Sequence, residues 1–104
     1  MRMVSDDLDQ MVDRVGWLKP VDYAIFEFYE SFQDPDDVAL TGRVISYNVG
    51  YQRGYVNQRL NSLTDAGLLT RVDEGIYELS STGSRFVTGS ATVKEIAALD
   101  PSDS

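Results

Sequence analysis

Apolar residues recur at helical spacing in several parts of the chain. Near the N-terminus they stand at i, i+3, i+4 and i+7, which predicts a short helix over about residues 6–15. Pro20 suits the first turn of a second helix, whose buried side would comprise Tyr23, Ala24, Ile25, Phe28, Tyr29 and Phe32. Towards the C-terminus one helical region carries Phe86 and Val87, and a last apolar stripe comprises Val93, Ile96, Ala97 and Leu99.

Two helices joined by a glycine turn are predicted in the middle of the chain. Thr41 is a good N-cap for a short helix that ends near Asn48 and carries Val44 and Ile45 inward. Gly50 can take a positive φ without a Cβ clash, which a tight turn between two crossing helices requires. The second helix follows directly after this turn.

This second helix, from about Gln52 to Ala66, has one apolar and one polar side. Its buried side is defined by Val56, Leu60 and Leu63. The polar side presents Gly54, Gln58 and Asn61, flanked by Asn57 on one edge and by Tyr51 and Tyr55 on the other. Carboxamide and guanidinium groups match base edges in the major groove, and a glycine would let the helix backbone approach closely. Gln52 and Gly54 start the helix weakly, so its first turn is expected to be loose.

A β-hairpin is predicted immediately after Gly67. Residues 68–72 and 76–80 run apolar or alternate as strands do, and residues 73–75 join them. A helix-turn-helix followed by a two-stranded hairpin is the winged-helix arrangement. We therefore expect an α+β winged helix-turn-helix fold, with a three-helix core, a two-stranded wing and extra terminal helices. Its single domain, 1–104, would divide into an N-terminal helix (1–19), the winged-helix core (20–89) and a C-terminal helix with a tail (90–104).

The charge distribution singles out the middle of the chain. The whole chain carries 9 bases and 17 acids, a net charge of -8. Residues 41–72, however, hold four arginines (Arg43, Arg53, Arg59 and Arg71) and only one acid, Asp65. Acids elsewhere would confine an anionic partner to this basic face. An acidic surface with few lysines also resembles proteins of salt-accumulating halophiles, although an ordinary acidic mesophile protein stays the alternative.

The composition argues against several other classes of protein. The chain has no cysteine and no histidine, so the common zinc ligands and the usual general base are missing. Asp36 and Asp37 are the only paired carboxylates that stand out, and their loop fits a solvated turn better than a calcium site. We expect no enzyme activity, no cofactor and no metal. No apolar run is long enough to span a membrane, no secretory signal is evident, and a cytoplasmic location is expected.

Many residues stand where MarR-type winged-helix regulators keep equivalent types, over about half of the chain. They are Leu40, Thr41, Ile45, Val49, Gly50, Tyr55, Val56, Arg59, Leu60, Leu63, Gly67, Leu68, Leu69, Arg71, Tyr77, Leu79 and Gly83. The chain also resembles haloarchaeal regulators related to the phage phi-H repressor in Trp17, Pro20, Asp22, Gly50, Tyr51, Arg53, Gly75, Ile76 and Tyr77. This resemblance implies DNA binding, transcriptional control and often a homodimer.

The predicted function is that of a sequence-specific DNA-binding regulator, a repressor that occludes its operator on double-stranded DNA. The candidate DNA contacts are Thr41, Arg43, Tyr51, Gln52, Arg53, Gly54, Tyr55, Asn57, Gln58, Arg59, Asn61 and Arg71. For Arg53 and Arg59, phosphate contact is favoured over base contact or packing, and the tyrosines could equally be packed side chains. Trp17 is assigned to packing. The alternative function is a winged-helix protein-interaction module that binds no DNA.

Two further features bear on assembly and on DNA contact. The terminal apolar stripes exceed what one small core covers, which predicts a homodimer through Leu8, Met11, Val12, Val15, Val93, Ile96 and Leu99. The predicted wing tip, Asp73-Glu74-Gly75, lacks the Arg or Lys of wings that enter the minor groove. Its acidity argues against insertion of the wing into DNA.

Overall fold

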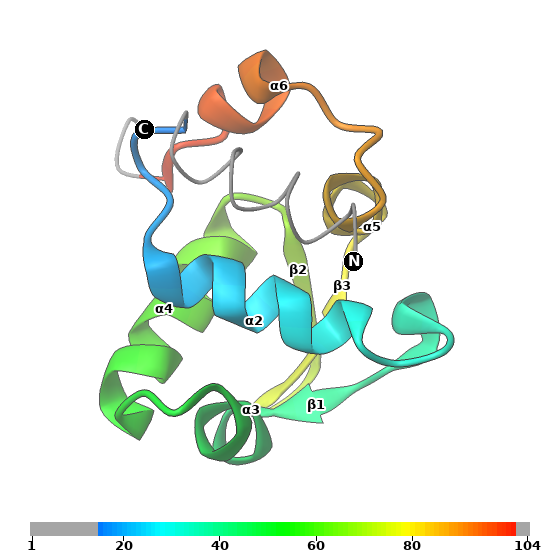
Figure 1. The fold of residues 1–104 in the computed structure, drawn as a ribbon. Helices are drawn as coiled ribbons and strands as arrows, with labels where there is room; N and C mark the ends of the chain where they lie inside the picture. The colour runs from blue at the N-terminus through cyan, green and yellow to red at the C-terminus, as the bar shows by residue number, and fades with distance from the viewer. Residues whose placement is uncertain (1–14, 102–104) are drawn as a thin grey trace.

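The computed structural model describes residues 15–101, and Figure 1 shows the arrangement of its elements. In chain order these are α2 (Pro20–Glu30), the 3-10 helix η1 (Pro35–Asp37), β1 (Leu40–Thr41), α3 (Gly42–Val49), α4 (Arg53–Asp65), β2 (Leu69–Asp73), β3 (Ile76–Leu79), α5 (Ser81–Val87) and α6 (Val93–Ala97). Helices α2, α3 and α4 pack on one another beside an antiparallel sheet. This arrangement confirms the predicted α+β winged helix-turn-helix fold. Most of the predicted helix over 6–15 lies outside the described residues, and Val15 stands in a non-helical turn.

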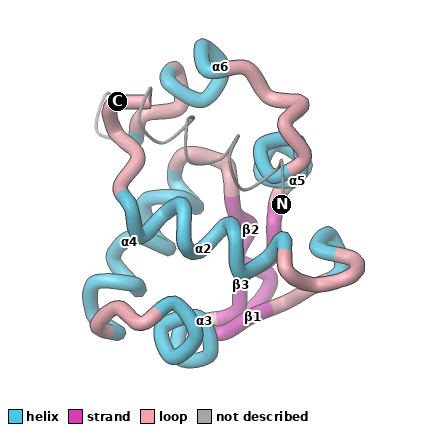
Figure 2. Tube along the Cα trace, viewed as in Figure 1, coloured by secondary structure: helices cyan, strands magenta, loops and turns pink. Residues whose placement is uncertain are grey.

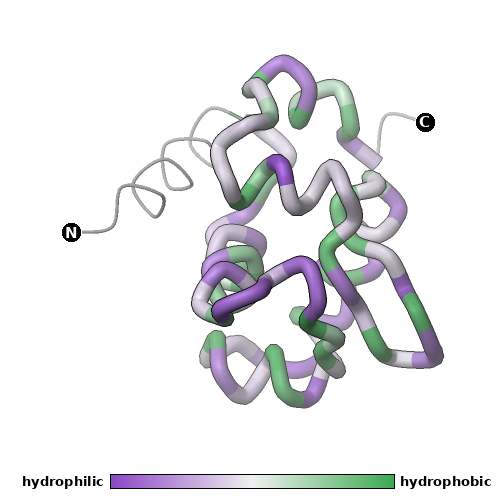
Figure 3. Tube along the Cα trace, turned by 90° about the vertical axis from the view of Figure 1, so that its right-hand side faces the viewer, coloured by the Kyte–Doolittle hydropathy of each residue, from purple (hydrophilic) through white to green (hydrophobic). Residues whose placement is uncertain are grey.

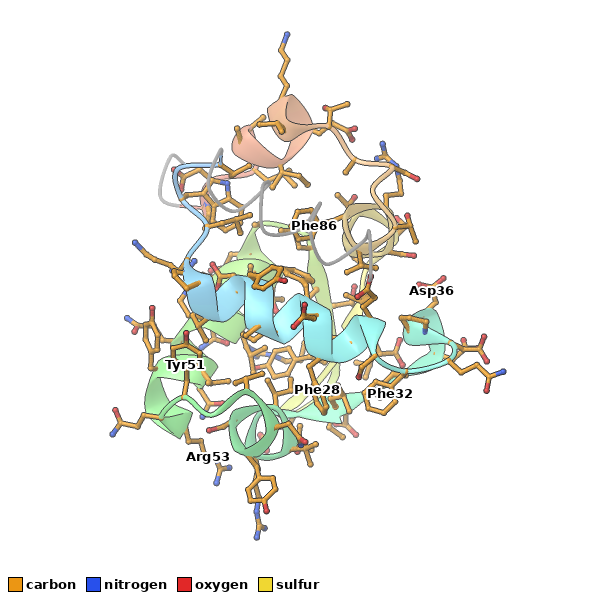
Figure 4. All side chains as sticks on the ribbon, in the orientation of Figure 1. Phe28, Phe32, Asp36, Tyr51, Arg53 and Phe86 are labelled. Atoms are coloured by element: carbon orange, nitrogen blue, oxygen red, sulfur yellow. The ribbon has the colours of Figure 1, made fainter. Side chains whose placement is uncertain are left out.

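Helix α2 begins at Pro20 and buries Ile25 and Tyr29 as predicted, but the rest of its buried face differs from the prediction. Its fully buried apolar side chains are Val21, Ile25, Phe26 and Tyr29. The predicted residues Tyr23, Ala24 and Phe28 are only half-buried, and Phe32 lies beyond the helix and is 37% exposed. The buried face is set by the neighbours α3, α4 and α5, which all contact α2. Figure 4 shows Phe86 of α5 above this helix, and its ring meets the Phe26 ring edge-on at 4.9 Å between centroids.

The helix-turn-helix follows the predicted local signals closely. Thr41 caps α3, because its hydroxyl accepts a hydrogen bond from the backbone N–H of Val44 at 3.2 Å. Gly50 ends α3 with φ 79°, the left-handed conformation that the turn requires. The prediction that Val44 points inward is wrong: its side chain is 42% exposed, and Ile45 and Ser46 form the buried side instead. The Ser46 hydroxyl donates to the Tyr51 carbonyl at 2.7 Å, which fixes the turn from inside.

The sheet has three strands in the order β1-β3-β2, drawn in magenta in Figure 2. The hairpin β2–β3 is the predicted wing, and β1 adds a strand that the sequence did not predict. Leu40 of β1 pairs with Tyr77, and Thr41 pairs with Ile76. Two residues are too few to show the period-2 pattern of a strand. The Tyr29 hydroxyl donates to the Tyr77 carbonyl at 2.8 Å, and burial of this phenol, reinforced by the Glu78 carboxylate, raises its pKa.

The C-terminal helices pack on the same core and correct part of the assembly prediction. The Trp17 indole N–H donates to the Ile96 carbonyl at 2.8 Å, which ties the segment before α2 to α6 and confirms a packing role for Trp17. Val15 and Ile96 are fully buried within the single chain, so they do not offer a surface to a partner. Val93 and Leu99 are half-buried against the same core, whereas Leu8, Met11 and Val12 lie outside the described residues.

Candidate nucleic-acid interface

Helix α4 exposes a polar face opposite its apolar one. Val56, Leu60 and Leu63 are fully buried against the core, as predicted. The outer face is exposed at Gly54, Asn57, Gln58 and Asn61, and it carries no acidic side chain until Asp65 in the last turn. No side chain caps the helix at Gln52, in line with the weak start that the sequence predicts. Figure 4 shows Arg53 and Tyr51 projecting outward where α4 begins.

A groove of roughly 530 Å³ separates the wing from α3 and α4. It is lined by Thr41, Gly42, Arg43, Arg53, Asn57, Asn61, Arg71, Glu74, Gly75 and Tyr77. Three of these residues are arginines and one is a glutamate, so the groove is positive on a chain of net charge -8. Six of the twelve predicted DNA contacts therefore line one groove. Its positive charge suits a polyanion chain.

Arg71 is held in this groove by contacts from two elements. Its guanidinium donates from Nη2 to the Asn61 carboxamide oxygen at 2.8 Å, and its Cζ lies 5.6 Å from the centre of the Tyr77 ring. The Tyr77 hydroxyl contacts the same Asn61 oxygen at 3.4 Å. Asn61 belongs to α4, Arg71 to β2 and Tyr77 to β3. The cluster joins the wing to the outer face of α4 and leaves the arginine on the surface.

The predicted tyrosines stand at the other edge of α4. Tyr51 and Tyr55 are 38% and 36% exposed, and their ring centroids are 6.2 Å apart. Both side chains are partly covered and partly exposed, so the two predicted alternatives, packing and phosphate contact, are compatible with each other. Tyr47 on α3, for which packing was also considered, is 87% exposed and is therefore not a packed side chain. The exposure of Tyr47 follows from the way α3 packs against α2, which the sequence alone does not show.

Arg59 has a role in the core, not at the groove. Its Nε and Nη2 donate to the two carboxylate oxygens of Asp22 at 2.9 and 2.6 Å, and Nη2 also reaches the Trp17 carbonyl at 3.4 Å. The hydrogen bond to Asp22 raises the pKa of Arg59, against the opposing effect of burial. Asp22 is fully buried and also accepts from the Lys19 backbone N–H at 2.8 Å. The favoured phosphate contact is therefore corrected, and we leave Arg59 out of the candidate surface.

The wing tip carries acidic residues as the sequence indicates. Gly75 takes φ 71° in the turn, and Asp73 accepts from the Glu74 backbone N–H at 2.7 Å. Figure 3 shows the strongly hydrophilic tip of this hairpin extending from the body of the molecule. Glu74 also lines the groove, so a carboxylate stands beside the arginines. A negative tip opposes entry of the wing between two phosphate strands.

Among residues 15–101, no three His, Cys, Asp or Glu side chains gather as a metal site would require. Within that same range, every helix falls short of the length and apolar character that crossing a membrane demands.

The sequence profile described as winged helix-turn-helix phage repressor matches residues 11–98. The chain belongs to this family. Searches of curated proteins and of solved structures find no match. In winged helix-turn-helix proteins the second helix of the motif is the one that enters the major groove, and in this phage repressor domain that helix is α4. Family membership therefore assigns a DNA-binding class to the fold whose α4 face and groove are described above.

Proposed function

We propose that this winged-helix domain binds double-stranded DNA sequence-specifically and represses transcription by occluding its operator. The outer face of α4 would enter the major groove, and Arg43, Arg53 and Arg71 would contact the flanking phosphates. The observation that carries the proposal is the positive groove beside an uncharged carboxamide face on an otherwise acidic chain. Thr41, Gln52, Tyr51 and Tyr55 lie around that face and are proposed as further backbone contacts.

The proposal is tested by selection from a pool of duplexes with a randomised centre, followed by titration of the selected duplex. Removing Arg43, Arg53 or Arg71 by substitution with alanine should weaken binding to all duplexes and lower the salt slope by about 1 per lost phosphate contact. Lys94→Ala is the matched control, because Lys94 is an exposed cation on α6, away from the groove. Binding that is equally unaffected by all four substitutions would contradict the proposed surface. Failure to bind any duplex would favour the alternative, a protein-interaction module.

We further propose that the repressor acts as a homodimer on a palindromic site. The support is the resemblance to dimeric regulators, together with the general symmetry of operators and their proteins. The two α4 helices would then lie about 34–36 Å apart, or a multiple of that distance. The buried positions of Val15 and Ile96 remove them from the proposed interface. Sedimentation that shows a monomer at tens of micromolar, in low and in molar salt, would exclude the dimer.

A further inference from the structure

The three carboxamides on the outer face of α4 differ in what they can still bind. A carboxamide reads adenine by a bidentate contact, in which its oxygen accepts from the adenine N6 amine and its nitrogen donates to N7. Both atoms must therefore be free and face the base. Asn57, Gln58 and Asn61 are all exposed. Their hydrogen bonds and close contacts within the chain decide which of them meets this requirement.

The carboxamide oxygen of Asn61 already accepts hydrogen bonds from within the chain. A guanidinium has only donors, so the group of Asn61 that faces Arg71 must be the carbonyl oxygen. That oxygen has two lone pairs, and the Arg71 guanidinium and the Tyr77 hydroxyl approach it at 2.8 and 3.4 Å. Only the Asn61 amine remains available to DNA. This side chain can donate to a base or a phosphate, but it cannot make the bidentate contact while it holds the wing.

Asn57 is also restricted, on the side that faces α3. Its carbonyl oxygen lies against Gly42, so closely that a Cβ at position 42 would collide with it. The residue lines the groove towards the wing together with Arg53. The oxygen of Asn57 is thus turned to the neighbouring helix and away from the centre of the exposed face.

Gln58 is the carboxamide that is free at both ends. Its side chain is exposed and makes no hydrogen bond to any residue in the described part of the chain. One turn earlier on the same face stands Gly54, and nothing lies within 4 Å of the place where a Cβ would be. The bare backbone at Gly54 lets the helix lie deep in a groove, and Gln58 then projects to the base edges. We infer that Gln58 is the specificity-determining residue of this surface and reads an adenine in the major groove, while Asn61 positions Arg71 and the wing.

This inference rests on the proposed DNA binding and is tested on the full chain with a pool of duplexes of randomised sequence. Wild type should enrich a motif with an adenine at one position of each half-site. Gln58→Ala should lose that adenine preference, about 5- to 150-fold in relative affinity, and keep the rest of the motif. Gln58→Glu should move the preference at this position to cytosine, whose N4 amine is a donor.

Asn61→Ala is the matched control on the same face. It should lower affinity for all duplexes and leave the adenine preference unchanged, because it releases Arg71 and removes no bidentate base contact. A motif that keeps its adenine in Gln58→Ala, or loses it in Asn61→Ala, would overturn the inference and leave the proposed function standing. Absence of any duplex binding by wild type would overturn both.

Discussion

Asp22 connects α2 to α4 through its ion pair with Arg59. It is fully buried, and both of its carboxylate oxygens accept from Arg59, whose side chain is 13% exposed. Removing one partner of a buried ion pair leaves an uncompensated charge in the core. The pair joins α2 to the back of the helix whose front is the proposed DNA surface.

Arg59→Met is expected to cost about 3–5 kcal/mol in the free energy of unfolding, because it leaves the Asp22 carboxylate buried without its cation. The double variant Asp22→Leu/Arg59→Met should recover most of that loss, since no buried charge remains. Urea unfolding measures both. Arg53→Met is the control for loss of an exposed arginine and should stay within about 0.5 kcal/mol of wild type. An effect of Arg59→Met as small as that of Arg53→Met would show that the ion pair contributes little.

At the scale of elements, α5 meets the sheet without space between them. A Cβ at Gly83 would collide with the backbone carbonyl oxygen of Leu68, which cannot move as a side chain can. Gly83→Ala should therefore destabilise the protein by about 1–3 kcal/mol, although alanine favours helix. Gly54→Ala, in open space on α4, should instead stabilise it by up to about 1 kcal/mol. The melting temperatures of the two variants should shift in opposite directions. Shifts of the same sign would contradict the close packing of Gly83 against Leu68.

Besides the buried Ile96, helix α6 is joined to α5 by the ion pair of Glu95 with Arg85, and this contact depends on pH. The Arg85 guanidinium holds the pKa of Glu95 below its ordinary value, and the Thr92 backbone N–H adds to the effect. The Glu95 carboxylate therefore takes up a proton more readily in the unfolded chain than in the folded one. Its stabilising effect is complete above about pH 4.5, and it is lost as the pH falls through the lower pKa that Glu95 has in the folded protein. The difference in melting temperature between wild type and Glu95→Gln should shrink from pH 6 to pH 3. A difference that stays constant over that range would exclude the ion pair as its cause.

Elements whose limits are set by neighbouring residues could be predicted, and those set by distant contacts could not. Thr41, Gly50 and Gly75 act locally, so the cap of α3, the turn before α4 and the hairpin all stand where the sequence indicated. The face of α2, the outward side chain of Val44 and strand β1 depend on partners elsewhere in the chain. Asp22 and Arg59 are 37 positions apart, and no local sequence pattern at either residue predicts that they pair.

For the whole molecule, charge separates the groove from the rest of the chain. Residues 1–40 and 73–104 carry most of the acids, whereas Arg43, Arg53 and Arg71 line the groove. Counterion release weakens phosphate contacts as salt rises, while screening relieves the repulsion between DNA and the acidic regions. If the acidic surface is an adaptation to a salt-rich cell, binding must rest mainly on base contacts and shape.

We therefore expect affinity for a selected duplex to fall only shallowly, or to rise, between about 0.5 and 2 M KCl, where charges are screened within a few ångströms. Fluorescence anisotropy with a labelled duplex measures the slope. Gln58→Ala should lower the affinity for the duplex at every salt concentration in this range, whereas Arg71→Ala should lower it most at low salt. A steep, continuous loss for wild type would indicate ordinary electrostatic binding and remove the halophilic interpretation.

Strand β1 and helix α3 follow each other without an intervening residue. Thr41 pairs with Ile76 in the sheet and at the same time caps α3, so the frame of the wing continues into the helix-turn-helix. The backbone thus links the wing directly to the helix-turn-helix, and a link of this kind would leave little backbone entropy to be lost on binding. On the proposed function, a duplex would then meet a contour that changes little, and the adjustment would fall to the DNA. Sequences whose grooves bend or narrow easily would then be preferred even at base pairs that no side chain touches.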